Sequence, residues 1–286
     1  MRFKFWGVRG SLPAAGQDTL KIGGNTTCLE VRCGDDLLIF DSGTGIRYLG
    51  NVILKAMPLR IRLFYTHVHW DHIQGFPFFP PLYFPENEFE IYGGSSLPVG
   101  IEEALKGQML APWFPVDMDV MGSKKKFFDL NPGDVVEGKG YKVTPISQHH
   151  PNNSYAYRVD CGEKSIVFAT DTEHYKDRID QNLLALSEGA DYLIYDSQYT
   201  EDEYYGRDGE ISRIGWGHST LEEGIKLAKA ARVKNYILFH YDPNHSDDFI
   251  KNREVEARKL FTNSVAAYEG LEIDLDDLED DYSIFR

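Results

Sequence analysis

The feature of the sequence that most constrains its fold is a cluster of three histidines and one aspartate within Thr66–His72, at the end of the strand-like run Arg60–Thr66. On an extended chain, residues 67, 69 and 71 project to one side, and a helical turn after Asp71 would bring His72 back to the same point. Neutral imidazole is a common ligand of zinc and similar ions, and a neighbouring carboxylate can bind a metal or orient water. The cluster therefore predicts a metal site at the end of a strand.

More candidate ligands follow apolar runs in the second half of the chain. They are His149 and His150 after Tyr141–Ile146, Asp171 after Ser165–Ala169, and His240 after Tyr236–Phe239. Each residue alone could simply cap a turn, as polar residues often do. Together with the cluster they favour metal ligation, and so many ligands are more than a single tetrahedral site can use. We therefore predict two divalent ions, and the pattern leaves the choice between His149 and His150 open.

The order of strand-like and helical runs fits two sheets with helices outside both. The expected strands are Phe3–Val8, Cys28–Cys33, Leu37–Asp41, Arg60–Thr66, Tyr141–Ile146, Tyr155–Asp160, Ser165–Ala169, Tyr192–Tyr195 and Asn235–Phe239, and the expected helices are Thr44–Leu54 and Leu221–Ala231. No linker or repeat divides the chain, so we predict a single domain over residues 1–268. An acidic C-terminal tail, 269–286, follows, with eight acids and no base between Glu269 and Asp281.

Charge and hydropathy exclude several classes of protein. The chain has 30 basic and 45 acidic residues, a net charge of −15, which argues against a sequence-independent grip on polyanions by the whole surface. Its apolar runs are far shorter than the ~20 residues of a membrane span. The N-terminus lacks the apolar segment and cleavage site of a signal peptide. We therefore expect a cytoplasmic protein with no membrane partner.

In this order, the candidate ligands resemble the five motifs of the metallo-β-lactamase superfamily, and the resemblance covers nearly the whole chain. It implies an α/β fold, an αββα sandwich of two mixed β-sheets with helices on both outer faces. The implied ligands of one ion are His67, His69 and His150, those of the other are Asp71, His72 and His240, and Asp171 bridges the two. Similar proteins carry the ligand directly before proline, which favours His150, with His149 as the fallback. Zinc is the simplest choice of metal, and manganese or iron also suits such ligands.

Two further motifs resemble one branch of this superfamily. An aspartate at the bridging position is typical of hydrolases that act on phosphodiesters and thioesters. Tyr195–Thr200 and Gly217–Thr220 resemble the acidic residue and the His-Ser-Thr element of the branch that contains the tRNA 3′-processing endonuclease and cyclic phosphodiesterases. The resemblance implies a hydrogen-bonded pair, Asp196 and His218. A histidine held by a carboxylate is suited to protonate the leaving group of a phosphodiester, although His218 could also cap the following helix.

Candidate substrate contacts lie in two loops that are expected to flank the site. Asn25 and Thr26 follow two glycines, whose backbone amides can approach anionic oxygens. Asn153 and Ser154 follow the presumed ligand His150, and turn formation is an equally good explanation for that segment. We predict Asn25, Thr26, Asn153 and Ser154 as substrate-binding residues.

From these observations we predict a binuclear phosphodiesterase in which two divalent ions activate water, with Asp71, Asp196 and His218 as catalytic residues. The expected substrate is a small cyclic phosphodiester, with a 3′,5′-cyclic nucleotide as the leading candidate. Extended nucleic acid is not expected as a partner, because neither a basic surface nor a tRNA-gripping arm is evident and Lys124–Lys126, read as a solvated loop, is the only tight basic run. The alternatives are a tRNA 3′-processing endoribonuclease and a non-catalytic metal-containing regulatory or binding protein. Homodimer formation is left open.

Overall fold

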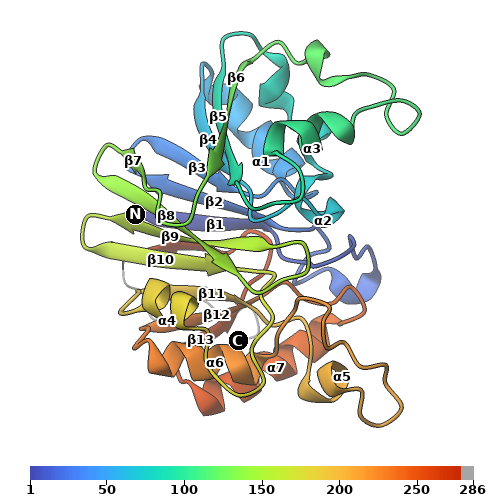
Figure 1. Cartoon of the computed structure of the whole chain (residues 1–286), viewed down its shortest axis with the longest axis vertical. Coiled ribbons are helices and arrows are strands. Elements are labelled where there is room, and N and C mark those ends of the chain that lie inside the picture. Colours follow the sequence, from blue (N-terminus) through green and yellow to red (C-terminus); the bar gives the residue numbers. More distant parts are fainter. Residues whose placement is uncertain (278–286) are drawn as a thin grey trace.

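The computed structural model describes residues 1–277 and consists of two seven-stranded β-sheets packed face to face (Figure 1). In the first sheet, β14, β1, β2 and β3 are antiparallel neighbours, and β3, β4, β5 and β6 run parallel. The bounds are β1 Arg2–Gly7, β2 Cys28–Cys33, β3 Asp36–Phe40, β4 Arg60–Phe64, β5 Glu88–Gly94, β6 Lys124–Leu130 and β14 Glu272–Asp274.

The second sheet has the same mixed character. Strands β7 to β10 form an antiparallel meander, and β10 to β13 continue the sheet as parallel neighbours. The bounds are β7 Val136–Gly138, β8 Tyr141–Gln148, β9 Ser154–Cys161, β10 Lys164–Ala169, β11 Tyr192–Asp196, β12 Asn235–Phe239 and β13 Ser264–Ala266.

Helices cover the outer faces of both sheets, as Figure 1 shows for α1 and α3 beside the first sheet and for α4, α6 and α7 beside the second. The bounds are α1 Ile46–Ile53, α2 Trp70–Ile73, α3 Ile101–Gly107, α4 Gln181–Ser187, α5 Glu201–Tyr205, α6 Leu221–Ala230 and α7 Asp247–Leu260. The predicted αββα sandwich is therefore confirmed.

The alternation of side chains along β4 shows how the layers are held together. Ile61 and Leu63 point into the apolar cluster between the first sheet and its helices, whereas Phe64 points into the cluster between the two sheets. Across that inner layer, Phe40 of β3 lies 5.9 Å from Phe168 of β10, measured between ring centroids. Apolar residues dominate the central strands because most of both faces is buried. The charged side chains within them are paired, as Arg62 of β4 is with Glu90 of β5 at 2.8 Å.

Two predictions about the periphery need correction. Lys124–Lys126 is not a solvated loop but the start of β6, at the edge of the first sheet, where Lys124 pairs with Glu88 of β5. Lysines suit such a position because they discourage the pairing of further strands. Part of the predicted tail, Glu272–Asp274, is β14 and pairs with β1, so the first sheet extends past residue 268. Residues 278–286 of that tail lie outside the described residues.

In the described part of the chain, no helix is long and apolar enough to cross a membrane.

Candidate active site

The seven predicted metal ligands converge in two groups at one edge of the sandwich, where β3, β4, β8, β10 and β12 end. In each group the possible ligand atoms lie within 4.8 Å of one another. The first group is His67, His69 and His150, and the second is Asp71, His72, Asp171 and His240. These groups match the two ligand sets that the resemblance implied, with Asp171, the implied bridge, in the second group.

Helix α2 brings the ligands of the histidine-rich segment together. His69 is still extended, with φ −64° and ψ 154°, and α2 begins at the next residue. The backbone N–H of His72 donates to the carbonyl of His69 at 3.0 Å, so the chain folds back within one turn. As a result, Asp71 and His72 face the same region as His67, although they belong to the second group of ligands.

Four of the imidazoles are oriented by a hydrogen bond at Nδ1. His72 donates to Asp41 at 2.8 Å and His240 donates to Gln198 Oε1 at 2.9 Å. The other two partners are backbone or hydroxyl oxygens, with His150 donating to the carbonyl of Gly217 at 2.9 Å and His67 to Thr66 Oγ1 at 3.1 Å. Partners of this kind fix the tautomer of a metal-binding histidine and leave its other nitrogen free for the metal.

The carboxylate of Asp171 lies between the two groups. Its Oδ2 is 3.2 Å from Nε2 of both His72 and His240, and its Oδ1 is 3.7 Å from Nε2 of His67. The carboxylate of Asp71 approaches the same two imidazoles, with Oδ2 at 3.1 Å from His72 and 3.3 Å from His240. This Oδ2 also accepts a hydrogen bond of 2.8 Å from the backbone N–H of Ser11.

For three of the ligands, His67, His150 and Asp171, the pKa shifts favour the forms that bind a metal, whereas the surrounding carboxylates raise the pKa of His72 against its burial. Burial and the neighbouring His72 lower the pKa of His67 well below its usual range, and burial lowers the pKa of His150 to about 4. Burial alone would raise the pKa of Asp171, but the imidazoles around it hold that pKa well below its ordinary value. Neutral nitrogens and an ionised carboxylate are the forms that bind divalent cations.

One unpaired atom shows that the cluster is incomplete without a further group. Nε2 of His67 is buried and has no hydrogen-bond partner among the described residues. A buried polar atom without a partner costs free energy, so native structures rarely contain one. A divalent ion bound by His67, His69 and His150 would satisfy this nitrogen, and the ligand types and their number also fit such ions. The identity of the metal is not fixed by this donor set.

The predicted catalytic pair is formed as expected from the sequence. Nδ1 of His218 donates to Asp196 Oδ2 at 2.9 Å. Burial alone would lower the pKa of His218, but the charge of Asp196 and this hydrogen bond raise it to about 9. The other oxygen of Asp196 accepts from the backbone N–H groups of Gln198 and Ser219. The helix that follows is capped by Thr220, so His218 is not its capping residue.

An open cleft of about 380 Å³ gives access to this chemistry. Segments that follow strands of both sheets line it, because His69, Trp70 and Asp71 come after β4 and Asp171 comes after β10. The lining residues are Ser11, Val68, His69, Trp70, Asp71, Asp171 and His218.

The four predicted substrate-binding residues have partners inside the protein. Asn25 donates from its side chain to Glu269, and Thr26 Oγ1 accepts from the backbone N–H of Thr44. Asn153 Nδ2 donates to the carbonyl of Ser96 at 2.8 Å, and Ser154 Oγ accepts from Gln148 at 2.9 Å. Their contact with substrate stays a prediction.

Sequence reasoning missed the residues that orient the ligands. Asp41 and Gln198 contact His72 and His240, and Glu173 accepts from the backbone N–H groups of Gly215 and Gly217. Asp41 shared one signal with the recognised ligands, because it follows an apolar strand. His149 lies outside both ligand groups, and its ring stacks on Tyr175 at a centroid distance of 4.7 Å.

Comparison with known proteins identifies the family. A family model described as "Beta-lactamase superfamily domain" matches residues 41–241, a range that includes all seven candidate ligands. The chain belongs to the β-lactamase superfamily.

Several relatives within this superfamily carry the name Ribonuclease Z. The protein of that name from Bacillus subtilis is 25% identical and aligns over 96% of this chain and 99% of its own length. The one from Methanosarcina acetivorans is 24% identical, with 96% and 98% covered. The alignment with the Bacillus protein spans 320 positions but takes in only about 275 residues of this chain, so about 45 positions have no counterpart here.

Solved structures confirm the fold. The metallo-β-lactamase fold protein YhfI from Bacillus subtilis has a TM-score of 0.70 at 20% identity, covering 95% of this chain and 98% of that one. The short form of human tRNase Z has a TM-score of 0.66 at 18% identity, covering 96% and 99%. A diphosphatase of the PhnP family has a TM-score of 0.68 at 18% identity, covering 98% and 99%.

These relatives overturn two predictions. The leading expectation of a cyclic nucleotide as substrate is wrong, because the near full-length relatives are named for ribonuclease activity. The expectation of a small-molecule partner without extended nucleic acid fails for the same reason. Both relied on the charge of the chain and on the lack of an evident tRNA-gripping arm. Net charge does not describe the charge at the site once divalent ions are bound.

Proposed function

We propose that the protein is a metal-dependent endoribonuclease that removes 3′ extensions from precursor tRNA. The observation that carries this proposal is the hydrogen-bonded pair of His218 and Asp196. His218 lines the same cleft as the carboxylates of Asp71 and Asp171. A cleft with this pair can both hold a phosphodiester and protonate its leaving group. The near full-length similarity to proteins named Ribonuclease Z supports RNA as the phosphodiester.

The ligand set would hold two divalent ions, His67, His69 and His150 binding one and Asp71, His72 and His240 the other, with Asp171 between them. Bound there, divalent ions supply Lewis-acid stabilisation of the charge on phosphate and make water more acidic. The carboxylates of Asp71 and Asp171 orient the attacking water by accepting its hydrogen bonds. The Ser11 N–H keeps Asp71 Oδ2 in place for this role.

His218 delivers the proton that the leaving oxygen needs. Its Nδ1–H is occupied by Asp196, so its Nε2–H is the one that can donate into the cleft. The ring is held firmly, since Asp196 is itself fixed by the backbone N–H groups of Asp171, Gln198 and Ser219. Asp196 thereby keeps the tautomer and direction of His218 suited to one proton transfer per bond cleaved.

The test is cleavage of a precursor tRNA that carries a 3′ extension. The purified protein, loaded with manganese or with zinc, is incubated with the end-labelled precursor, and the new 3′ end is mapped. We expect one cut at the start of the extension, and no cut by Asp171→Ala. Turnover of bis(p-nitrophenyl) phosphate without any cleavage of the precursor would contradict the proposal, while confirming that the site hydrolyses phosphodiesters.

A further inference from the structure

Trp70 is the most unusual side chain at the cleft. It lies between His69 and Asp71 in the ligand segment, yet 81% of its surface is exposed. It is also one of the residues that line the cleft. Tryptophan is a large, mostly apolar residue that is normally well covered. An exposed one beside a reaction centre therefore indicates a surface that something else covers during function.

The backbone that carries Trp70 is held in place. Its carbonyl accepts from the N–H of Gln74 at 2.8 Å, and Ser42 donates to the carbonyl of His72 and accepts from the N–H of Gly75, each at 2.8 Å. Helix α2, which begins at Trp70, is thus tied to the end of β3. The backbone that carries the indole is therefore fixed in position, which lowers the conformational entropy lost when a ligand packs on this side chain.

We propose that Trp70 binds the substrate by stacking on a base next to the cleaved bond. This inference rests on the proposed ribonuclease function. A phosphate that reaches Asp71 and His218 in the cleft leaves the bases of its two neighbouring nucleotides near the other lining residues, and Trp70 is one of these. The bases of a single-stranded 3′ extension are not held in a helix, so one of them is free to pack on an aromatic ring.

Stacking on an indole also suits an enzyme that must cleave 3′ extensions of different base sequence. Every base has a flat face, so an aromatic platform accepts different sequences, whereas hydrogen bonds to base edges would select one. The indole carries no charge, and its contribution does not depend on basic residues, which this acidic chain has in short supply. Trp70 thus offers RNA affinity at the point of cleavage without a phosphate contact.

The chain provides a matched control. Trp113 is 82% exposed, as much as Trp70, but it is not among the described residues that line the cleft. It follows α3 and precedes Phe114, whose ring contacts Phe78 at 5.8 Å between centroids. A general effect of removing an exposed indole should be equal in Trp70→Ala and Trp113→Ala. A stacking role should appear only in the first.

The experiment measures kcat/KM on precursor tRNA for wild type, Trp70→Ala, Trp70→Phe and Trp113→Ala, with metal content checked in each. We expect Trp70→Ala to lose about 5- to 150-fold, the change that corresponds to the ~1–3 kcal/mol of one base stacked on an aromatic ring. Trp70→Phe should recover most of this loss, and Trp113→Ala should stay within about twofold of wild type. Equal activity of Trp70→Ala and wild type would overturn the inference.

Two abasic substrates then identify the contact. One lacks the base on the 5′ side of the cleaved bond and the other lacks the base on the 3′ side. For one of them, we expect wild type to fall to the level of Trp70→Ala and the variant to lose nothing more, as a pairwise interaction requires. An unchanged ratio of wild type to variant on both abasic substrates would refute stacking.

Binding separates this inference from the proposed function. Fluorescence anisotropy of a labelled single-stranded RNA that spans the junction is measured with metal-free protein. If wild type fails to cleave the precursor, the proposed function fails, and weaker RNA binding by Trp70→Ala than by Trp113→Ala still supports the stacking contact. Equal binding of the RNA by these two variants would count against it whatever the cleavage assay shows.

Discussion

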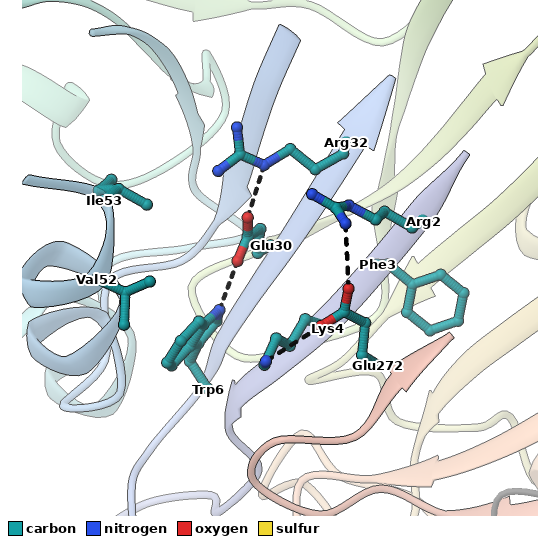
Figure 2. Close-up of a pocket in the computed structure, with 9 residues that line it drawn as sticks. All are labelled: Arg2, Phe3, Lys4, Trp6, Glu30, Arg32, Val52, Ile53 and Glu272. Atoms are coloured by element: carbon teal, nitrogen blue, oxygen red, sulfur yellow. Dashed lines mark hydrogen bonds and ion pairs between the residues drawn. The ribbon is translucent and has the colours of Figure 1, made fainter. Parts of the chain in front are cut away.

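Two of the hollows in the described part of the chain differ in how their charged side chains are paired. The first lies on β1, β2 and β14, is about 260 Å³, and is shown in Figure 2. In it, Glu30 accepts from Trp6 Nε1 and Arg32 Nε, and Glu272 pairs with Lys4 at 3.1 Å and with Arg2. Each carboxylate thus has two donors within the pocket. The second hollow is the cleft beside the ligand cluster.

In the cleft, by contrast, carboxylates and imidazoles converge as the ligands of a bound ion do. The carboxylates of Asp71 and Asp171 each approach both His72 and His240, and Nε2 of His67 has no hydrogen-bond partner within the described chain. Oppositely charged side chains that pair at a surface stabilise the protein modestly. Converging ligands with an unpaired buried nitrogen instead need a further group to bind there. The comparison shows that pairing, and not the mere density of charge, distinguishes a reactive site from a structural one.

The strongest test of the comparison is removal of the shared carboxylate. Asp171→Ala should lower phosphodiesterase activity by about 10⁴-fold or more, as expected for a member of a group that acts as a unit. It should also reduce bound metal, measured by elemental analysis after reconstitution and desalting. Asp177→Ala, which removes an exposed aspartate six residues away, should leave both unchanged. Full metal content in Asp171→Ala would show that the carboxylate does not bind the ions.

His218→Ala should have the next largest effect. We expect kcat on RNA to fall by about 10²- to 10⁴-fold, the usual loss when a general acid is removed, with metal content intact. Bis(p-nitrophenyl) phosphate should be affected less, because p-nitrophenolate leaves without a proton. Equal losses on the two substrates would instead indicate that His218 positions the phosphate.

Glu173 allows a test of a residue that affects the ligands only through the residues it holds in place. Its Oε1 accepts from Tyr204 Oη and Gly215 N–H at 2.7 Å, and its Oε2 accepts from Gly217 N–H at 3.0 Å. Gly217 in turn holds Nδ1 of His150. A glutamine has a single acceptor oxygen, so at least one of these contacts must be lost in Glu173→Gln.

We expect Glu173→Gln to lower the affinity for metal by about 10- to 100-fold, the range for partners of metal-binding histidines. Competition with a metal chelator measures that affinity, and activity at saturating metal should recover most of the wild-type value. Glu210→Gln, an exposed control, should bind metal like wild type. Unaltered metal affinity in Glu173→Gln would mean that Gly217 keeps its position without this carboxylate.

The smallest effect is expected in the pocket of Figure 2. Glu272→Ala removes the partner of Lys4 and Arg2, three side chains that are all partly exposed. Ion pairs of this kind contribute about 0–1 kcal/mol, so the free energy of unfolding, measured with urea, should fall by no more than that. Activity on precursor tRNA should stay within about twofold of wild type. A larger loss of activity would show that the pocket of Figure 2 is not merely structural, against the comparison drawn above.

The sequence allowed the ligands to be predicted because each of them follows an apolar strand and their order matches a known set. Asp41 follows a strand as well, yet its role could not be predicted, because it depends on β3 lying next to β4 in the sheet. Gln198 belongs to a motif that was recognised, but its contact with His240 comes from the neighbouring position of β11 and β12. Contacts between strands far apart in sequence carry no local pattern.

The outer parts of the sheets were harder to predict for a different reason. Three consecutive lysines begin β6, and β-propensity alone disfavours them. At the edge of a sheet, however, a strand can expose such side chains and still make its backbone hydrogen bonds to one neighbour. Similarly, β14 is built from an acidic segment, and cross-strand pairs of Glu272 with Arg2 and Lys4 of β1 help to place it.

The prediction of substrate was wrong because it used a property of the whole chain to describe one site. A net charge of −15 describes the average surface, and a large share of it lies in the last residues. Affinity for RNA also depends on bound divalent ions and on stacking, and neither of these appears in a count of Lys and Arg.

Asp41, Asp171 and His240 have left-handed backbone conformations, with φ of 60°, 55° and 63°. Residues other than glycine adopt this region at a cost of ~1–2 kcal/mol each. The protein therefore carries a few kcal/mol of instability at two candidate ligands, Asp171 and His240, and at Asp41, the partner of His72. A descendant freed from catalytic selection could place glycine there and become more heat-resistant. Glycine at these three positions in a homologue would thus mark a pseudoenzyme before any assay is run.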